Sequence, residues 1–468
     1  MSPYKKIDKN DIDYIKSLIS EDRILIGQDI PKEYYHDEMP EYGIYPPDVY
    51  VEVLNKEEVS KLLKYCNEKN IPITARGAGT GLAGGATCKE GGILLSVMKM
   101  NKILEVDEEN LSMTVEPGAL LVDVAAAAEA HGMFYPPDPG EKTASIGGTV
   151  MTNAGGMRAV RYGLTRDYVR AIECVLPNGN ILNLSSNVVK NTTGLDIKDL
   201  MIGSEGILSV CTKITLKLVA KPKCSFSLVV PFDDMEKCIK TVPKLLNSPI
   251  VPTAIEFIEE ELLDIVERTL GKPFPDRSGK AYLIVMIDGS SKANVEADCD
   301  IAADICLEAG ALDVLLCDTA ERIGSVWSIR GSVLEGMKAD TTSEEEADVV
   351  VPRNRIADYV IRAKELGAKY NVRIITVGHA GDGNIHTEIL RDNLTDEEWK
   401  TNTDAVLKGL YAISKEFGGQ LSGEHGIGNG RLKYLKDFVG EDMYEVYKNV
   451  KLAFDPNLIL NPGKMIEF

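Results

Sequence analysis

The chain has 468 residues, of which 44% are hydrophobic and 26% charged, and its formal net charge is −20. This length exceeds what one hydrophobic core supports, so two or three domains are expected. The negative charge argues against nucleic acid or an anionic membrane as a partner, and the apolar runs are too short to span a bilayer. Nine scattered cysteines without a CxxC pair argue against an iron–sulfur cluster and a disulfide framework, and the amino terminus lacks a signal-peptide core. We therefore expect a cytoplasmic protein.

The first half alternates short strands and helices after an amino-terminal helical extension over residues 1–44. Val49–Leu54 and Ile71–Ala75 are predicted strands. Between them, Asn55 is expected to cap a helix over Lys56–Lys69. The mixture of short strands and helices indicates an α+β domain.

A glycine-rich loop follows the second of these strands. Residues Arg76–Ala86 contain five glycines, and Gly79–Gly84 matches GxGxxG. A Rossmann site needs a helix next, whereas Gly91–Ser96 reads as another strand, so that interpretation is rejected. What remains is a loop whose backbone N–H groups can approach a phosphate closely. A merely flexible loop is the alternative.

A second glycine-rich stretch, Tyr135–Gly156, follows the predicted helix Ala119–His131. Its Gly140–Thr143 piece resembles the end of a P-loop, but the lysine does not directly follow the glycine and three prolines stand nearby. Nucleoside-triphosphate hydrolysis is therefore disfavoured. Two phosphate-type loops in one domain predict one long ligand that contains a diphosphate.

After a boundary at Lys221–Lys223, strands and helices alternate again, with the cadence of a split β-α-β domain over residues 221–420. The predicted strands are Ser225–Val230, Ala281–Ile287, Asp313–Cys317, Asp348–Val351 and Val372–Val377. The predicted helices begin at Asp233 and extend over Ala293–Ala309, Ala320–Met337 and Ile356–Tyr370.

Three of the five histidines lie in two short glycine-flanked segments, His379–His386 and Glu424–His425. The strand ending at Val377 delivers His379, a glycine turn follows, and a second strand from Asn384 carries His386. Both imidazoles can then meet at one end of the sheet. Two histidines and one carboxylate with open positions suit zinc, iron(II) or manganese. A hairpin with satisfied, purely structural histidines is the alternative.

The order of the motifs resembles the flavin domain of the vanillyl-alcohol oxidase/p-cresol methylhydroxylase superfamily. The matching pieces are Arg76–Gly81, Pro136–Pro139, Ser145–Thr149, Asn153–Gly156 and Gly203–Gly206. The HxGDGNxH and SGEHGxG motifs, with Phe454–Lys464, resemble its FAD-linked oxidase branch. That branch contains glycolate oxidase flavin subunits and flavin-dependent D-lactate and D-2-hydroxyglutarate dehydrogenases.

The resemblance implies a two-subdomain FAD-binding fold over residues 45–220, a ferredoxin-like cap over 221–420 and a segment over 421–468 that returns to the flavin domain. Thr80 stands where some relatives attach the flavin to a histidine, so the FAD should be non-covalent. The implied FAD-binding residues are Arg76, Gly77, Ala78, Gly79, Thr80, Gly81, Pro137, Asp138, Ala144, Ser145, Gly147, Gly148, Asn153, Gly155, Gly206, Ile207 and Asn461.

In the second half, the resemblance implies that His379, His386 and Glu424 bind a divalent metal. His425 would be the catalytic base, and Arg330 would bind the substrate carboxylate. These roles fit the oxidation of a hydroxy acid by hydride transfer to the flavin. A surface helix salt bridge is the alternative for Arg330.

Two departures from the branch bear on the substrate. Glu388 stands where many relatives have asparagine, and Ser343–Glu346 is acidic where relatives that accept a dicarboxylate tend to have lysine. We therefore expect a small monocarboxylate such as lactate or glycolate. The resemblance makes D-lactate the first choice, with glycolate and 2-hydroxyglutarate as alternatives. The reduced flavin needs an acceptor, for which an electron-transfer flavoprotein is the leading candidate.

Two rival classes of function remain. They are a non-redox transferase of the ether-lipid synthase type and a metal-dependent hydrolase or binding protein.

Overall fold

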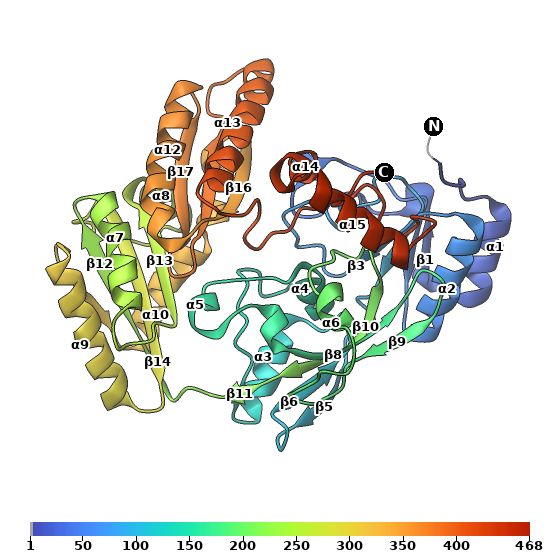
Figure 1. Cartoon of the computed structure of the whole chain (residues 1–468), viewed down its shortest axis with the longest axis horizontal. Helices are drawn as coiled ribbons and strands as arrows, with labels where there is room; N and C mark the ends of the chain where they lie inside the picture. The colour runs from blue at the N-terminus through green and yellow to red at the C-terminus, as the bar shows by residue number, and fades with distance from the viewer. Residues whose placement is uncertain (1–2) are drawn as a thin grey trace. The chain divides into compact units, whose positions relative to one another are not determined.

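The computed structural model describes residues 3–468, which form two compact units. Of the described residues, unit 1 comprises residues 3–155, Leu164–Lys221 and His425–Phe468, and unit 2 comprises Gly156–Gly163 and Pro222–Glu424. Figure 1 traces both, with the carboxy-terminal segment of unit 1 in red.

Unit 1 begins with a four-stranded sheet in the order β1-β2-β4-β3, in which β2, β4 and β3 run parallel. Helix α2 is capped by the Asn55 side chain and packs on the core through Val59, Leu62 and Leu63. The predicted helix Lys56–Lys69 is thus confirmed. In chain order, the α-helices and strands as far as β4 are α1 (Lys9–Leu18), β1 (Ile24–Ile26), β2 (Val49–Glu52), α2 (Lys56–Lys69), β3 (Ile73–Arg76) and β4 (Ile93–Ser96).

The second sheet of unit 1 is antiparallel, in the order β5-β6-β10-β8-β9. Its strands are β5 (Ile103–Asp107), β6 (Ser112–Val115), β8 (Val169–Val175), β9 (Ile181–Leu184) and β10 (Val210–Lys217). The remaining elements are α3 (Leu121–Ala130), β7 (Met133–Phe134), α4 (Ile146–Thr152), α6 (Ile197–Met201), β11 (Val219–Ala220), α14 (Leu432–Val439) and α15 (Glu441–Phe454). A bridge between Ile73 and Leu460 ties the carboxy-terminal segment to the first sheet.

Unit 2 is built on a seven-stranded sheet in the order β15-β12-β14-β13-β17-β18-β16, in which neighbouring strands are antiparallel. The strands are β12 (Cys224–Phe232), β13 (Ala254–Glu259), β14 (Ala281–Gly289), β15 (Leu315–Cys317), β16 (Glu344–Val350), β17 (Arg373–His379) and β18 (Asn384–Leu390). The helices are α5 (Ala159–Tyr162), α7 (Met235–Leu246), α8 (Glu260–Leu270), α9 (Lys292–Glu308), α10 (Ala320–Gly331), α11 (Val333–Asp340), α12 (Ile356–Lys369) and α13 (Asp396–Glu416).

Helices cover both faces of this sheet, and Figure 1 shows α7 and α9 running along β12 and β14. Residues from α8, α10 and α11 form one apolar cluster with Ile284, Ile375 and Val377. Helix α12 lies on the opposite face, where its Tyr359 hydroxyl bonds to Thr387. Because side chains alternate along a strand, His386 next to Thr387 points to the first face.

Two expectations for this unit need correction, and two of its elements were missed. The strand β13 and the helix α8 were not predicted, and the predicted helix Ala320–Met337 is two helices that meet at Ser332. The predicted strand Asp348–Val351 begins earlier, at Glu344, so the acidic segment around Glu346 is part of a buried strand.

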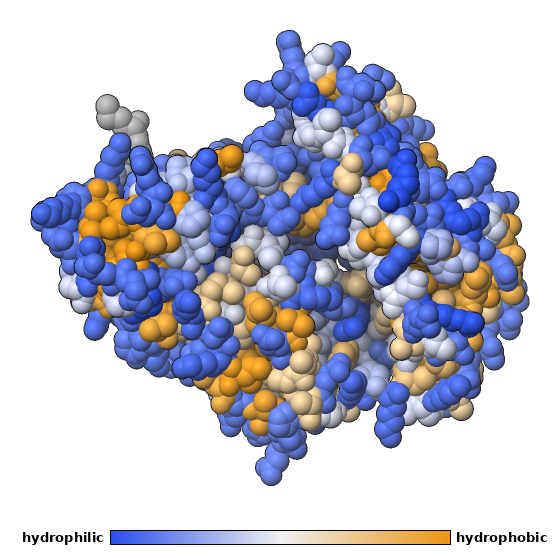
Figure 2. All heavy atoms as spheres, turned by 180° about the vertical axis from the view of Figure 1, so that it is seen from behind, coloured by the Kyte–Doolittle hydropathy of each residue, from blue (hydrophilic) through white to orange (hydrophobic). Residues whose placement is uncertain are grey.

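On the face that Figure 2 shows, most residues are hydrophilic. Figure 2 shows apolar atoms in separate patches on one face rather than as a continuous band. Among residues 3–468, no helix combines the length and apolar character that a membrane span needs.

Candidate active site

The hairpin of β17 and β18 places two histidines on the same face of the unit 2 sheet. His386 pairs with Val377 across the hairpin, and Val377 precedes His379 by two residues. The side chains of His379 and His386 therefore lie on the same face of the sheet. The two imidazole rings lie 5.2 Å apart between centroids, edge to face. The strands approach closely at Gly378, where a Cβ would lie 2.3 Å from the carbonyl oxygen of Asn384. A side chain at this position would push the two histidine strands apart.

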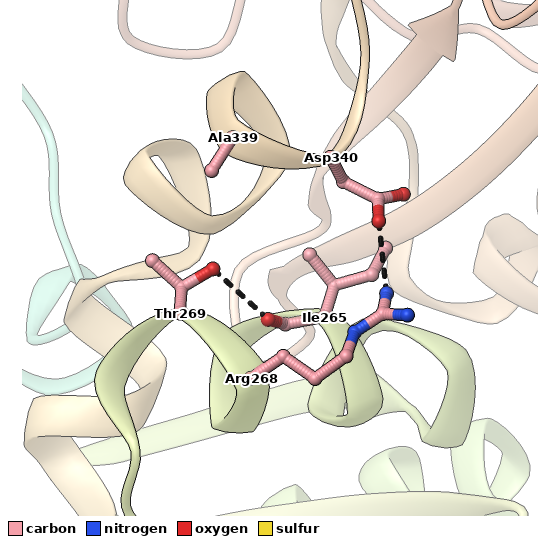
Figure 3. Close-up of a pocket in the computed structure, with 5 residues that line it drawn as sticks. All are labelled: Ile265, Arg268, Thr269, Ala339 and Asp340. Atoms are coloured by element: carbon pink, nitrogen blue, oxygen red, sulfur yellow. Dashed lines mark hydrogen bonds and ion pairs between the residues drawn. The ribbon is translucent and has the colours of Figure 1, made fainter.

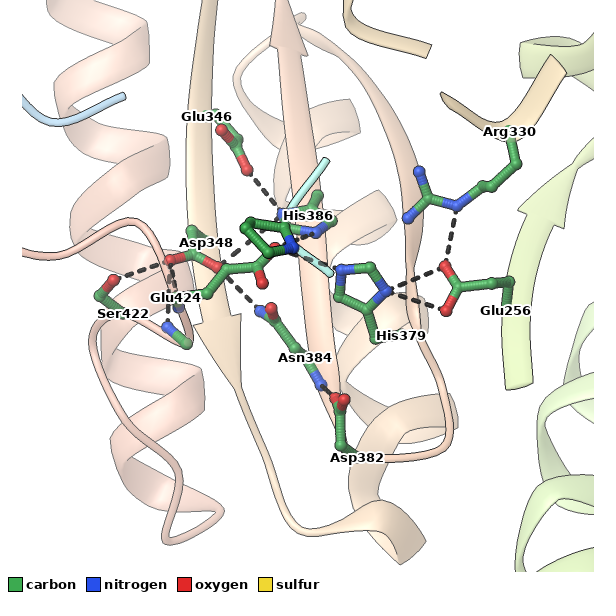
Figure 4. Close-up of polar contacts among 12 residues, drawn as sticks. Glu256, Arg330, Glu346, Asp348, His379, Asp382, Asn384, His386, Ser422 and Glu424 are labelled. Carbon is green, nitrogen blue, oxygen red and sulfur yellow. Dashed lines mark hydrogen bonds and ion pairs between the residues drawn. The ribbon is translucent and has the colours of Figure 1, made fainter. Parts of the chain in front are cut away.

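Both imidazoles converge on one carboxylate oxygen (Figure 4). The Nε2 atom of His379 lies 3.1 Å from Glu424 Oε1, and the Nε2 atom of His386 lies 3.4 Å from the same oxygen. The ligand atoms of these three residues all lie within 4.8 Å of one another. This spacing is that of donor atoms around a single ion.

A second carboxylate stands behind each imidazole. His379 Nδ1 lies 2.9 Å from both oxygens of Glu256, and His386 Nδ1 lies 2.8 Å from Glu346 Oε1. Glu256 is fully buried, and Glu346 nearly so. A carboxylate that accepts from Nδ1–H fixes the tautomer that leaves Nε2 to bind a metal. The pairing therefore orients the Nε2 atoms of both imidazoles toward Glu424.

The charges at this cluster are strongly coupled. Burial alone would lower the pKa of His379, but the carboxylates of Glu256 and Glu424 raise it to about 10. Burial likewise opposes the charged form of His386, and its carboxylate neighbours Glu346 and Glu424 raise its pKa well above the usual value. Burial opposes ionisation of Glu424, but the two imidazoles hold its pKa well below its usual value. The carboxylates around the two imidazoles therefore favour positive charge at this point of the sheet.

The donor set therefore fits a divalent metal. Two neutral imidazoles and one carboxylate match the arrangement that leaves coordination positions open for substrate. The supporting carboxylates give the fit a further basis, because ligating histidines in metal sites nearly always donate their other ring N–H to a carboxylate, a backbone carbonyl or a water.

Arg330 reaches the same face from α10. Its Nε donates to Glu256 Oε2 at 2.9 Å, and both side chains are buried, so a surface salt bridge is the wrong interpretation. Its Nη2 is buried and has no hydrogen-bond partner among residues 3–468. A buried guanidinium nitrogen without a partner is costly, and an anionic ligand would satisfy it.

Glu388 lies on the same strand face as His386 and directly opposite Glu346. Its Oε2 is buried and has no hydrogen-bond partner in the described part of the chain. Burial raises the pKa of Glu388 well above its usual value, and Glu346 and Glu344 reinforce the shift. The interior beside His386 is therefore crowded with carboxyl groups rather than lined by a lysine.

His425 follows Glu424 in the chain and is the first residue of the returning part of unit 1. Its side chain is partly buried. In the same unit, Glu205 accepts hydrogen bonds from the backbone N–H groups of Ile427 and Gly428 at 2.7 and 2.6 Å. The loop that carries His425 is thus attached to the Gly203–Gly206 turn.

The two glycine-rich segments of unit 1 meet at Ser145. Its hydroxyl caps α4 and accepts from the Ala78 and Gly148 N–H groups, both at 3.3 Å. A Cβ at Gly77 would lie 2.1 Å from this hydroxyl, and one at Gly147 would lie 2.6 Å from a proline carbon. The segments thus form one surface rich in backbone N–H groups, which fits a bound diphosphate.

Arg76 has a different place from the one expected of a cofactor ligand. Its guanidinium donates to the carbonyl oxygens of Glu33, His36 and Ala86, and Gly79, with φ of +79°, wraps closely around it. The side chain therefore stabilises the glycine-rich loop through hydrogen bonds to backbone carbonyl oxygens.

Asn461 presents a buried polar atom in unit 1 that a bound ligand could satisfy. Its Nδ2 donates to the carbonyl oxygens of Gly85 and Glu205, whereas its buried Oδ1 has no partner among residues 3–468. The other predicted FAD residues also belong to unit 1, and FAD contacts for them stay a prediction. They are Thr80, Gly81, Pro137, Asp138, Ala144, Asn153, Gly155, Gly206 and Ile207.

A cavity of about 260 Å³ between α8 and α11 is a separate feature (Figure 3). It is lined by Ile265, Arg268, Thr269, Ala339 and Asp340. Arg268 is exposed and paired with Asp340 at 2.8 Å, and none of the candidate site residues lines this cavity. It offers no buried polar group for a ligand.

The sequence did not point to Glu256, Glu346 or Asp348 as site residues. Asp348 is fully buried and accepts from Asn384 Nδ2 at 2.8 Å and from the Ser422 hydroxyl at 2.7 Å. The available signal was the presence of acidic residues inside otherwise apolar strands, because a carboxylate is rarely buried without a partner.

Two family models match the chain: FAD linked oxidases, C-terminal domain, over residues 221–465, and FAD binding domain, over residues 47–185. The chain is 44% identical over 467 residues to D-lactate dehydrogenase of Anaerostipes hadrus, with 99% of this chain and 98% of that protein covered. It is 37% identical over 435 residues to glycolate oxidase subunit GlcD of Bacillus subtilis, with 92% and 91% covered. The solved structure of p-cresol methylhydroxylase with substrate bound superposes with a TM-score of 0.82 at 20% identity, over 99% and 98% of the two chains. This likeness confirms the predicted fold.

Proposed function

Since the chain belongs to the FAD-linked oxidase family, we propose that it is a FAD-dependent dehydrogenase that oxidises a small 2-hydroxy acid, D-lactate above all, to the 2-oxo acid. The observation that carries the proposal is the convergence of His379 and His386 on Glu424 Oε1, with a carboxylate behind each imidazole. The similarity to D-lactate dehydrogenase of Anaerostipes hadrus supports this substrate, and the similarity to a glycolate oxidase subunit makes glycolate the second candidate.

Bound FAD supplies a two-electron acceptor, and a bound zinc, iron or manganese ion supplies Lewis-acid polarisation of a hydroxyl group. The chain would hold the cation through His379, His386 and Glu424, and the FAD through its glycine-rich loops without a covalent link. Glu256 and Glu346 keep the imidazole Nε2 atoms in the orientation that binding requires.

The remaining roles belong to Arg330 and His425. Arg330 would hold the substrate carboxylate with the nitrogens that Glu256 leaves available, and so orient the hydroxyl-bearing carbon. His425 would take the hydroxyl proton at an imidazole nitrogen as hydride leaves that carbon. The carboxyl groups of Glu344, Glu346 and Glu388 favour a substrate with a single carboxylate, because they offer a second one acidic side chains rather than a cationic partner.

The electrons must then leave the protein. The nine cysteines are all unpaired, and their spacing offers no iron–sulfur cluster. The proposal therefore includes a protein acceptor, an electron-transfer flavoprotein being our choice, and a cytoplasmic location.

An anaerobic titration of the purified flavoprotein tests the proposal. We expect D-lactate to bleach the visible flavin band at the lowest concentration, ahead of glycolate, L-lactate and 2-hydroxyglutarate. Absence of bleaching by all four acids would contradict the dehydrogenase function and favour the transferase alternative. Bleaching that persists unchanged after chelation would remove the metal from the mechanism.

His425→Gln tests the proposed base. We expect flavin reduction to slow by about 10²–10⁴-fold, the usual contribution of a positioned acid–base group, with metal and FAD content unchanged. A variant with near-normal bleaching rates would exclude His425 from proton transfer.

A further inference from the structure

The segment from Ser422 to Gly428 carries both the proposed ligand Glu424 and the proposed base His425. These residues, all of which the structure describes, lie in no helix or strand. No regular ladder of backbone hydrogen bonds therefore holds the two side chains where the proposed chemistry needs them. Something else must fix this segment.

On the side of Glu424, Asp348 of β16 holds the backbone. Its Oδ2 accepts from the Gly423 N–H at 3.1 Å, from the Glu424 N–H at 3.0 Å and from the Ser422 hydroxyl at 2.7 Å. The Gly423 N–H also approaches the Asp348 carbonyl oxygen at 2.9 Å. Asp348 is 0% exposed, so its carboxylate has no access to water, and its Oδ2 forms hydrogen bonds with the segment that carries Glu424 instead.

On the side of His425, the Glu205 carboxylate holds the backbone, within unit 1. Its Oε1 accepts from the Ile427 N–H and its Oε2 from the Gly428 N–H. Gly426 lies against this carboxylate with φ of +85°, and a Cβ there would lie 2.7 Å from Glu205 Oε1. Only glycine allows the loop to approach the carboxylate so closely.

We propose that Asp348 and Glu205 are positioning residues: Asp348 for the metal ligand Glu424, and Glu205 for the base His425. Each carboxylate holds two successive N–H groups. Those of Gly423 and Glu424 include the peptide that leads into Glu424, and those of Ile427 and Gly428 lie two and three residues after His425. The roles of Glu424 and His425 rest on the proposed function, whereas the attachment of the segment does not.

The first test measures the attachment itself. Hydrogen–deuterium exchange of the holoenzyme, resolved to single amides, is compared for Asp348→Asn and Glu205→Gln. We expect the amides of Gly423 and Glu424 to exchange about tenfold faster in the first variant only, and those of Ile427 and Gly428 about tenfold faster in the second only. Unchanged exchange in either variant would overturn the proposal for that residue.

Buried carboxylates elsewhere in the same units provide matched controls. Asp288→Asn in unit 2 and Glu173→Gln in unit 1 also remove buried acids that accept from side chains, but neither touches this segment. Both should leave its exchange rates and the metal affinity as in the wild type. If Asp348→Asn fails to fold, Ser422→Ala removes one donor and should show a smaller change in the same direction. For Glu205, Gly426→Ala serves likewise by displacing the loop from the carboxylate.

The second test separates the two roles. Asp348→Asn should weaken binding of added Mn²⁺ by about 10–100-fold with FAD content unchanged. Glu205→Gln should bind Mn²⁺ as the wild type does, yet reduce flavin about tenfold more slowly, with an altered pH profile and an unchanged KM for D-lactate. Faster exchange without these effects would mean that the carboxylates only stabilise the loop, which overturns the proposal. A wild-type protein that is reduced by no hydroxy acid would refute the proposed function, while the exchange rates would still decide whether the two carboxylates fix the segment.

Discussion

Glu256 connects two groups that the proposed reaction uses separately. One carboxylate accepts from the proposed metal ligand His379 and from the proposed substrate ligand Arg330. Burial opposes its ionisation, but these two cations lower its pKa, so it keeps its charge. Glu256→Gln leaves one oxygen and an NH₂ group in place of two acceptors. We expect metal affinity to fall by about 10–100-fold and the KM for D-lactate to rise as well, in metal titrations and steady-state kinetics.

Glu259 is the matched control for this prediction. It lies on the same strand, is buried, and accepts from Thr376 N–H at 2.8 Å and from Lys364 at 2.8 Å, away from the histidines. Glu259→Gln should lower the stability of unit 2 without changing metal affinity. Equal losses of metal affinity in both variants would mean that any buried charge on β13 matters, and that Glu256 has no special role.

Asp37 gives a pH-dependent prediction in unit 1. This carboxyl is 3% exposed, and burial raises its pKa to about 6 from an ordinary value of 3.8. Between these pH values the folded state binds more protons than the unfolded state, so this group lowers stability progressively as pH rises, and its cost is complete above about pH 6. Asp37→Asn should therefore raise the free energy of unfolding of unit 1 by about 2–3 kcal/mol at neutral pH and by almost nothing near pH 4. Urea unfolding at the two pH values measures the difference, and an equal gain at both would contradict it.

At the scale of elements, the close pairing of β17 and β18 depends on a single glycine. Gly378 has no room for a Cβ beside the Asn384 carbonyl oxygen, whereas Gly324 in α10 has open space around it. Gly378→Ala should cost about 1–3 kcal/mol and weaken metal binding, because it separates the two histidine strands. Gly324→Ala should be neutral or add up to about 1 kcal/mol. Thermal unfolding and metal titration of both variants check the contrast, which equal effects would refute.

The hairpin was also the element that the sequence predicted best. Two short strands around a glycine turn form a local pattern, so the meeting of His379 and His386 could be foreseen. Glu256 and Glu346 could not, because they reach the site from β13 and β16, which flank the hairpin in the sheet but not in the chain. That order depends on long-range strand pairing, which alternation of apolar and polar residues does not encode.

At the scale of the whole molecule, the proposed metal ligands belong to unit 2 and the glycine-rich loops to unit 1. Each unit has its own apolar core. A ligand stabilises the part of the protein that binds it, by about 2.7 kcal/mol at a concentration 100 times its dissociation constant. Chelation should therefore lower the unfolding temperature of unit 2, and removal of FAD that of unit 1, in calorimetry with hydrogen exchange to assign the transitions. Loss of stability in unit 1 on chelation alone would contradict the assignment of the ligands.

The general architecture could be predicted because it rests on motif order. The order of the glycine-rich motifs from Arg76 to Gly206 identified the flavin fold. The resemblance also predicted that the carboxy-terminal segment returns to the flavin domain. The division of the chain is less regular than a sequence boundary suggests, since Gly156–Gly163 belongs to unit 2 although it lies within the flavin-domain sequence. Its Arg161 donates to carbonyl oxygens of Val251 and Asp288, contacts between residues far apart in the chain.

The boundary between Glu424 and His425 has a consequence for inheritance and engineering. All three proposed ligands precede that peptide bond, and the proposed base follows it. A chimaera that takes residues 156–163 and 222–424 from a relative would thus import a complete set of ligands and their supporting carboxylates, while the recipient keeps its own base and flavin loops. The metal preference of relatives could then change by exchange of these residues as one piece, without any change in how the flavin is bound.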